Sequence, residues 1–183
     1  MRKYPLLFIL LACIFSSCTQ KINLAYEPVI ERCEEKKGNL FLGSFEDGRQ
    51  KLDVGSKRNV YGIPIVTLVT EDDVALWVTN ALKLEMENAG YTITDQIQNE
   101  AYQFEGKVIR VYTTTYFIYH GRMTVEISVK REGSEVFRKI YTTKVSNGIS
   151  FIASSASCSK TLALNLQQVC KQFISDFNLL DKS

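Results

Sequence analysis

Few side chains in this sequence are of the kinds that catalyse reactions or hold metals. The chain of 183 residues has one histidine, His120, and five cysteines. It contains no C-x-x-C, H-E-x-x-H, P-loop or G-x-G-x-x-G spacing, which gives zinc, nucleotide and dinucleotide sites no support. A catalytic histidine must be held by a rigid neighbour, whereas His120-Gly121 is predicted to be a solvated hairpin connection. We therefore expect a non-enzymatic protein without a cofactor or metal.

Two groups of charged residues have both a structural and a functional interpretation. Asp72 and Asp73 would suit acid–base chemistry, but they precede an apolar helical pattern, and acidic residues stabilise helix N-termini. We expect them to begin a helix. Asp47 and Arg49 follow a short apolar run and are predicted to form a local ion pair at the exit of a strand. The alternative is that this pair contacts a partner.

Positive charge collects in the part of the chain that is expected to form a sheet. Residues 101–147 carry eight lysines or arginines and four acids, whereas residues 71–100 carry seven acids and one lysine. A basic sheet face would bind anionic lipid headgroups or lipopolysaccharide phosphates; the alternative is an ordinary solvated face. The candidate anion-binding residues are Lys107, Arg110, Arg122, Lys130 and Arg138. A formal net charge of +2 does not indicate nucleic-acid binding.

The beginning of the chain predicts export. Arg2 and Lys3 precede an apolar run from Leu6 to Phe15. As a helix this run would span about 15 Å, half of a hydrocarbon core of about 30 Å. It is too short to cross a membrane and is typical of a signal peptide.

The sequence FSSC at 15–18 resembles the lipobox of bacterial lipoproteins, with Cys18 as the lipidated residue. Cys13 is a rival that would leave a very short signal. Two or more acyl chains on the cysteine give a stable anchor that does not span the bilayer. Thr19 follows the cysteine, which in the proteobacterial sorting pattern implies the outer membrane, here on its periplasmic side.

Three further cysteines lie beyond the lipobox. Export favours disulfide formation, but Cys158 and Cys170 would lie about 18 Å apart along one helix and cannot pair there. Cys33 with either of them is the only candidate disulfide. Three buried thiols are the alternative.

Hydrophobic periodicity predicts two amphipathic helices. Apolar residues recur at helical spacing within 71–89, where Thr70 and Asp73 resemble a capping box and Gly90 is placed to end the helix. A second apolar stripe runs from Leu162 to Leu180. Both helices are expected to cover one face of a sheet.

The remaining pattern predicts the sheet. Residues 102–146 form a three-stranded meander, with strict alternation of apolar and polar residues at 123–130. A short strand is expected at 40–45 and is ended by residues 46–49. A surface loop follows to about Tyr61, and 63–69 would be a second short strand or an extended approach. Val111 to Phe117 is uncharged and would be either an ordinary strand or a site for strand addition by another chain.

The fold class is therefore α+β: a mainly antiparallel sheet, with a meander of three long strands and short N-terminal strands, and two helices on one face. The expected organisation is a signal peptide at 1–17, a lipidated tether at 18–38 and a single domain at 39–183.

This order of elements resembles the YajG-type bacterial envelope lipoproteins over about residues 39–180. The resemblance rests on FEDGR at 45–49 after the first strand and on AGYTI at 89–93 after the first helix. It implies an envelope lipoprotein with a small α+β domain, from a family without an established activity. We expect a binding or assembly module whose partner is an envelope protein or a second copy. The alternative is a carrier or chaperone for lipid or lipopolysaccharide that uses the basic face.

Overall fold

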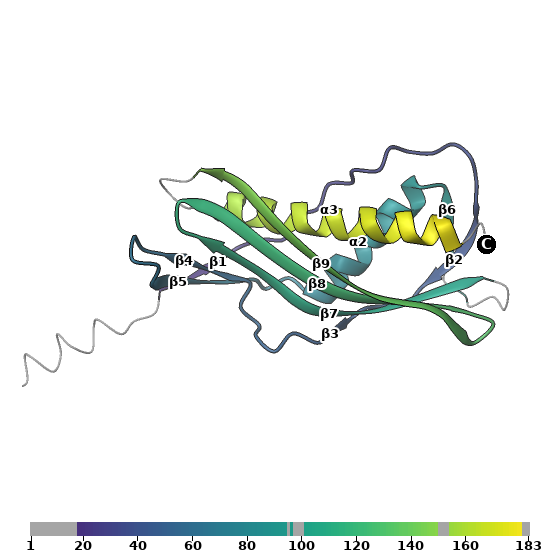
Figure 1. Ribbon diagram of the computed structural model, residues 1–183, viewed down its shortest axis with the longest axis horizontal. Coiled ribbons are helices and arrows are strands. Elements are labelled where there is room, and N and C mark those ends of the chain that lie inside the picture. Colours follow the sequence, from purple (N-terminus) through teal and green to yellow (C-terminus); the bar gives the residue numbers. More distant parts are fainter. Residues whose placement is uncertain (1–17, 95, 97–100, 150–153, 181–183) are drawn as a thin grey trace, which may run out of the picture.

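The computed structural model describes residues 18–94, 96, 101–149 and 154–180. The signal peptide predicted at 1–17 lies outside the described residues. A mixed, mostly antiparallel nine-stranded sheet carries two helices on one face, as the α+β prediction requires (Figure 1). In chain order the elements are β1 (Cys18–Lys21), β2 (Gly38–Leu42), β3 (Glu46–Asp47), β4 (Gly55–Arg58), β5 (Pro64–Val69), α2 (Val74–Asn88), β6 (Tyr91–Thr94), β7 (Tyr102–Thr115), β8 (Ile118–Arg131), β9 (Ser134–Ile149) and α3 (Ser155–Leu180).

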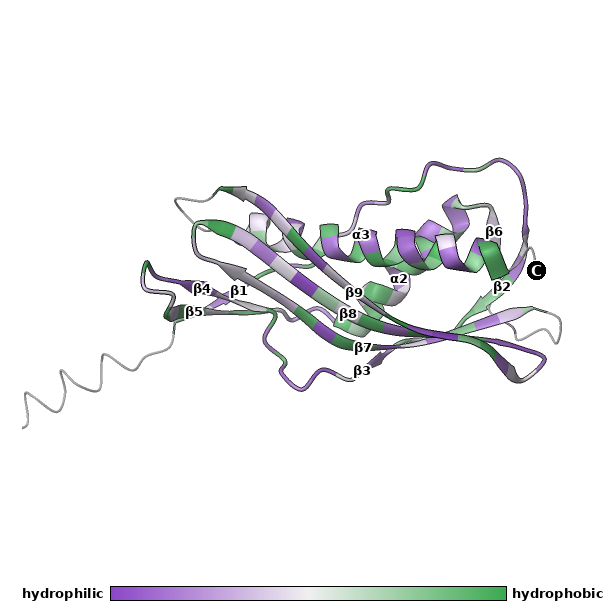
Figure 2. Ribbon diagram, viewed as in Figure 1, coloured by the Kyte–Doolittle hydropathy of each residue, from purple (hydrophilic) through white to green (hydrophobic). Residues whose placement is uncertain are grey.

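The predicted meander is confirmed as β7, β8 and β9, paired antiparallel. Glu132 and Gly133 connect β8 to β9 with φ values of 52° and 76°. Two consecutive left-handed residues make the tight turn that matches the twist of the flanking strands. Apolar and polar residues alternate along these strands, which separates a helix-covered face from an open face (Figure 2).

The predicted hairpin connection at His120-Gly121 is wrong, because both residues lie inside β8. The chain turns earlier, at Tyr116 and Phe117. A Cβ on Gly121 would lie 2.1 Å from the amide nitrogen of Asn165 in α3. The glycine therefore allows the helix to approach the sheet closely, and such a close approach is a common reason for a glycine inside a strand.

One edge of β7 pairs in parallel with three short strands in turn: β2, β3 and β4. Val111 to Thr115 pairs with β8 on one edge, and Thr113 to Thr115 pairs with β4 on the other, so the stretch is an ordinary strand of the sheet, the first of the two interpretations. The surface loop expected after Arg49 to about Tyr61 is wrong in part, since β4 lies within it. Gly55 packs so closely on β7 that an added Cβ would lie 2.3 Å from the Thr113 carbonyl oxygen.

The first helix, α2, begins three residues later than predicted. Asp73 is its N-cap, and the Asp73 carboxylate accepts a hydrogen bond of 3.0 Å from the Leu76 amide. Thr70 instead accepts a hydrogen bond from the Asp72 amide. Gly90 follows the helix with φ of 98°, the left-handed conformation predicted for it.

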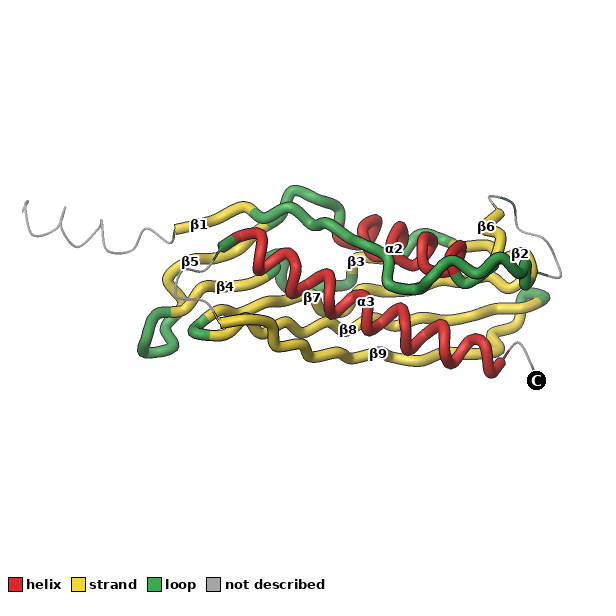
Figure 3. The backbone as a smooth tube through the Cα atoms, turned by 90° about the horizontal axis from the view of Figure 1, so that it is seen from above, coloured by secondary structure: helices red, strands yellow, loops and turns green. Residues whose placement is uncertain are grey.

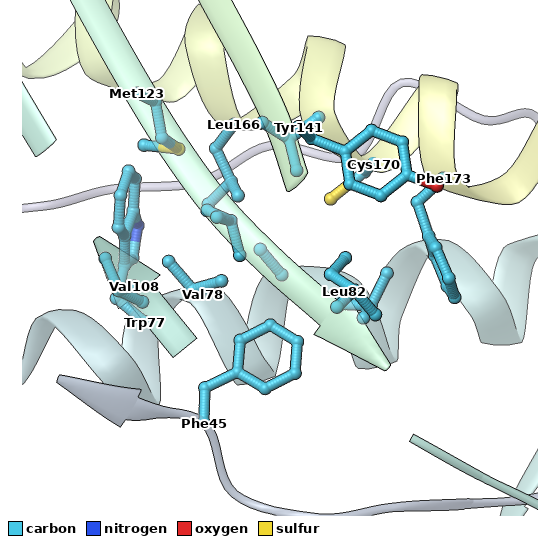
Figure 4. Close-up of a cluster of buried hydrophobic side chains, with 14 of the residues drawn as sticks. Phe45, Trp77, Val78, Leu82, Val108, Met123, Tyr141, Leu166, Cys170 and Phe173 are labelled. Atoms are coloured by element: carbon cyan, nitrogen blue, oxygen red, sulfur yellow. The ribbon is translucent and has the colours of Figure 1, made fainter. Parts of the chain in front are cut away.

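The second helix, α3, lies across β7, β8 and β9 and buries the predicted stripe (Figure 3). Phe173 and Phe177 have no more than 1% of their surface exposed and contact Phe104 of β7 edge to face, with centroids 5.3 and 4.9 Å apart. Figure 4 shows side chains of α2 and α3 meeting in this core. Among the described residues, no helix is long and apolar enough to cross a bilayer.

The described cysteines are Cys18, Cys33, Cys158 and Cys170, and all four are free thiols. The proposed bridge from Cys33 to α3 is absent. Burial raises the pKa of Cys170 to about 12. The thiol of Cys170 is therefore protonated near neutral pH and packs as a small apolar group.

The tether predicted at 18–38 is not a free linker. Its first residues form β1, which pairs in parallel with β5. Residues 22–37, here called the N-terminal strap, then cross the helix layer between α2 and α3 (Figure 3). Ile22 is 2% exposed, and the Ser159 hydroxyl and the Gln167 amide of α3 donate to strap carbonyl oxygens.

A buried carboxylate holds the strap on α2. Glu85 is fully buried and accepts hydrogen bonds from the Tyr26 hydroxyl at 2.5 Å and from the Val29 and Ile30 amides at 2.8 and 2.9 Å. Burial, and then the neighbouring Cys170 and Glu85, raise the pKa of Tyr26. The Tyr26 hydroxyl therefore keeps its proton and acts as a donor to the carboxylate.

Glu85→Ala should release the strap. The change leaves the Tyr26 hydroxyl and the Val29 and Ile30 amides without an acceptor, and each unpaired buried donor costs about 1–3 kcal/mol. We expect a lower free energy of unfolding in urea, and amide exchange at Val29 and Ile30 faster by at least about tenfold. Glu87→Ala, on the exposed side of the same helix, should change neither. Unchanged exchange in Glu85→Ala would show that other contacts hold the strap.

Candidate functional site

The open face of the long strands carries all five predicted anion-binding residues. Lys107 and Arg110 come from β7, Arg122 and Lys130 from β8, and Arg138 from β9. Buried neighbours of these residues, such as Val108, Met123 and Val129, point to the helices, as successive side chains in a regular strand alternate between faces. The sheet therefore places these cations opposite the hydrophobic core.

A β-bulge puts Arg110 on this face. The register of β7 against β8 shifts between Val108 and Arg110. Val108 and Val111 are both buried, and the two residues between them, Ile109 and Arg110, are both exposed. Strict alternation from Val108 would have turned Arg110 toward the core, and the extra residue of the bulge re-aims it.

Three of the five cations are paired with carboxylates. Lys107 lies 2.9 Å from Glu46, and Lys130 lies 2.7 Å from Glu105. Arg138 contacts both Glu126 and Glu135, and its hydrogen bonds lower the pKa of Glu135. These pairs link neighbouring strands, and carboxylates of the sheet neutralise the positive charge of the three side chains.

The other two cations, Arg110 and Arg122, line a groove of about 890 Å³ on the open face. One wall is the segment 48–58 that leads into β4, and the floor is formed by β7, β8 and β9. Neither arginine makes an ion pair with a described residue. Among the described residues, the basic ones that line the groove are Arg49, Lys51, Arg58, Arg110, Arg122 and Lys144, and the acidic one is Asp53.

Sequence reasoning missed the contributions of Lys51, Arg58 and Lys144 to this groove. Lys144 is one of the eight basic residues of 101–147. The register of the predicted hairpin is the signal that could have located it, because Lys144 lies directly opposite Arg122 in the pairing of β8 with β9. Side chains in such positions have Cβ atoms about 5 Å apart, and like charges there destabilise the sheet. Two adjacent cations without a described carboxylate partner favour an anion between them.

The floor of the groove is polar. Tyr112 donates a hydrogen bond to the Ser56 hydroxyl at 3.1 Å, which ties β7 to β4. His120 Nδ1 lies 2.9 Å from the Ser146 hydroxyl oxygen. This exposed pair has no described carboxylate to orient the imidazole, as a working serine–histidine pair requires. The groove is therefore equipped to bind anions by charge and hydrogen bonding.

Asp47 and Arg49 form an ion pair at the rim of the groove. Arg49 Nε and Nη2 lie 2.9 and 2.8 Å from the two Asp47 carboxylate oxygens, and Arg49 Nη1 also donates to the Leu52 carbonyl. Only 6% of the Arg49 side chain is exposed. The pair fixes the exit from β3 and uses the Arg49 charge locally.

A second hollow of about 530 Å³ lies on the helix side, between the strap and the first half of α3. Ile22, Tyr26 and Leu164 give it a mainly apolar lining, with Lys21 and Lys160 also present. It does not share residues with the basic groove. The five predicted cations all lie on the other face.

Comparison with known proteins supports the fold. No protein-family model matches the chain, and no curated protein matches it in sequence. The crystal structure of protein XCC0632 from Xanthomonas campestris, of the family DUF330, matches with a TM-score of 0.57 and 11% identity, over 85% of this chain and 92% of that one. That of an uncharacterized protein matches with a TM-score of 0.56 and 8% identity, over 88% and 98%. The chain thus shares its fold with proteins that are themselves uncharacterised.

Arg49→Gln should destabilise the fold in a pH-dependent way. Hydrogen bonds from Arg49 lower the pKa of Asp47, and an unfolded aspartate titrates near pH 4. Because the pKa of Asp47 is lower in the folded than in the unfolded state, the ionised carboxylate adds to the free energy of unfolding above about pH 4. This stabilisation is lost as the pH falls through the pKa of the folded state. Urea unfolding should show a loss of about 1 kcal/mol at neutral pH that shrinks below about pH 4.

The control for this effect is the same substitution in an Asp47→Asn background. There is no carboxylate at position 47 in that background, so the Arg49→Gln loss should be small and independent of pH. An equal loss in both backgrounds at every pH would mean that Arg49 acts through packing alone.

Proposed function

We propose that this protein is a lipid-anchored, non-enzymatic binding module of the bacterial envelope, and that its basic groove receives an acidic segment of another envelope protein. The observation that carries the proposal is the pair Arg122 and Lys144, held side by side without a described counter-charge. A fold that keeps two like charges adjacent gives up stability, which a bound anion would restore.

The anchor rests on the lipobox and on the position of Cys18. Cys18 is the first described residue, begins the outermost strand β1 and is exposed. An acyl group on its sulfur would point away from the core. With Thr19 after it, the expected place is the periplasmic side of the outer membrane. The resemblance to YajG-type lipoproteins supports the same assignment.

The chemistry of the groove favours a protein over a lipid. Its floor is polar, with Tyr112, Thr114, His120 and Ser146 exposed to a ligand. An acyl chain needs an apolar lining, and the mainly apolar hollow between the strap and α3 lies on the other side of the sheet and shares no residue with the groove. Carboxylates of an acidic segment match a group of cations that lie side by side on neighbouring strands, Arg110 of β7, Arg122 of β8 and Lys144 of β9.

A lipopolysaccharide-type headgroup is the second candidate ligand. Its phosphates would engage the same uncompensated cations. The acyl chains of such a ligand would have to remain in the membrane, because Ile109, Val111 and Val145 are the only large apolar side chains among the described residues that line the groove. The carrier alternative therefore predicts binding to phosphate-bearing vesicles rather than to an acidic peptide.

Arg122→Gln should weaken ligand binding while stabilising the free protein. We expect the dissociation constant of a fluorescent oligoglutamate peptide, measured by anisotropy, to rise about fivefold at low salt. The loss of the repulsion from Lys144 should raise the free energy of unfolding by about 0.2–1 kcal/mol. A merely structural arginine would not combine a gain in stability with a loss of binding.

Arg138→Gln is the matched control from the same face. Arg138 is already paired with Glu126 and Glu135, so its loss should leave peptide binding nearly unchanged. Binding to lipid A vesicles but not to the peptide would overturn the protein-binding proposal in favour of the lipid alternative. Equal effects of Arg122→Gln and Arg138→Gln on peptide binding would show that the groove is not the binding site.

Mass spectrometry of the natively purified protein should find a mature chain that begins at Cys18. A diacylglycerol on the Cys18 sulfur and an acyl chain on its amine should add their masses, and Cys18→Ala should remove them and release the protein from membranes. Cys33→Ala is the control and should leave the lipid mass and the membrane fraction unchanged. Full-length material without acyl chains would contradict the anchor.

A further inference from the structure

Exposed apolar side chains gather at one end of the elongated molecule. They come from the β4–β5 turn, the β7–β8 turn and the end of β9, which lie together in two views (Figures 1 and 3). The set, here called the apolar tip, consists of Val60, Tyr61, Ile63, Tyr116, Phe117, Ile118 and Ile149. Their exposed fractions run from 39% for Ile118 to 84% for Tyr61. Contiguous apolar surface of this kind marks an interaction site.

The tip is built by specific contacts. The Asn59 side chain accepts hydrogen bonds from the Tyr61 and Ile63 amides, both at 3.0 Å, which shapes the β4–β5 turn. The Tyr116 hydroxyl donates to the Val60 carbonyl and so joins the two turns. The Tyr116 and Phe117 rings pack with their centroids 4.3 Å apart. The apolar side chains are thus presented together on an ordered surface.

Strand pairing places the mature N-terminus beside this tip. β1 runs parallel to β5, with Cys18 opposite Val66. Ile63 lies three residues before Val66, about 10 Å along the strand direction. Because β1 and β5 both run away from this end, an acyl chain that leaves Cys18 backward along the strand passes the apolar tip.

The composition of the tip matches a membrane interface. Tyrosines place an apolar ring and a polar hydroxyl at the headgroup level, and aliphatic side chains enter the acyl boundary. Arg58 flanks the tip, where its guanidinium donates to the Gly62 carbonyl at 3.2 Å. A cation at this position lies at the depth of lipid phosphates.

We propose that the apolar tip inserts into the same membrane leaflet that holds the acyl chains of Cys18, so that the domain stands end-on upon the bilayer. The proposal deepens the proposed function and rests on its lipid anchor for the choice of a bilayer as the occupant of the tip. It adds a second contact to the acyl chains, and it fixes which end of the groove faces the lipid.

The test uses the mature chain with Cys18→Ser, which carries no acyl chain, and vesicles of brominated phosphatidylcholine. Tyr61→Trp places a reporter at the tip, and Val136→Trp places one near the β8–β9 turn, away from the tip. Trp77 is buried and common to both. At high lipid concentration we expect bromine to quench Tyr61→Trp strongly and Val136→Trp little. Absent or equal quenching at the two positions overturns the proposal.

A paired variant measures the strength of the contact. Phe117→Ser with Tyr61→Ser should lower the vesicle partition coefficient of the unlipidated chain by about tenfold or more, since each exposed ring contributes apolar transfer energy. The control, Ile140→Ser, removes an exposed apolar side chain from the middle of β9 and should change partitioning little. An unchanged coefficient in the tip variant overturns the proposal.

The failure of the anchor would be seen separately. Natively purified protein should float with vesicles in a density gradient if Cys18 is acylated, whatever the tip does. The quenching and partition measurements use a chain without acyl groups, and so they judge the tip alone. The alternative occupant of the tip is a second copy of the chain. Dimers of the wild-type chain in solution that are lost in the paired variant, together with no quenching by vesicles, would support that occupant and overturn the membrane contact.

Discussion

The two-residue alternation of β7, β8 and β9 is the constraint on which the rest of the structure depends. It gives one face to α2 and α3 and the other to solvent, so core and groove are two products of the same register. A slip by one residue would exchange Met123 and Val125 with Arg122 and Thr124, and burying an unpaired guanidinium costs several kcal/mol. The bulge at Val108–Arg110 breaks the alternation of β7. It keeps valines inward on both sides while turning Arg110 into the groove.

The second constraint is the buried carboxylate of Glu85. A fully buried acid is retained only where donors satisfy it, and here all three donors come from the strap. The strap thereby closes the helix layer and sets the path from β1 to β2. Because β1 carries Cys18, this path also decides where the proposed anchor would leave the domain. The packing of a buried acid in the helix layer thus bears on the position of Cys18, the residue proposed to carry the lipid.

Local patterns predicted the elements that bury a complete face. The alternation at 123–130 and the stripe from Leu162 to Phe177 are strong because each element packs one whole side. β4 was missed because the letters GSKR carry no apolar period; it is a strand through its pairing with β5 and β7. The sequence of the strap predicts a tether because Pro28 and the charged residues at 31–37 leave no sustained apolar periodicity. The groove could be predicted only in part. The cations of its floor follow from strand alternation, whereas Lys51 and Arg58 reach the groove through the parallel pairing of β4 with β7, which a local sequence pattern does not indicate.

The groove and the apolar tip are built from the same strands. The orientation of the domain on a bilayer would therefore determine which part of the groove lies near the lipid. His120 and Ser146 lie two or three residues from the tip residues Ile118 and Ile149, whereas Arg110 is seven residues from Phe117, about 23 Å along β7. If the domain stands on the bilayer by its tip, the groove begins near the headgroups and runs away from them. Anionic headgroups would then compete for the near end only. An acidic protein segment could still occupy the cations around Arg110 and Lys51, which favours a partner that approaches from the periplasm over a ligand confined to the membrane.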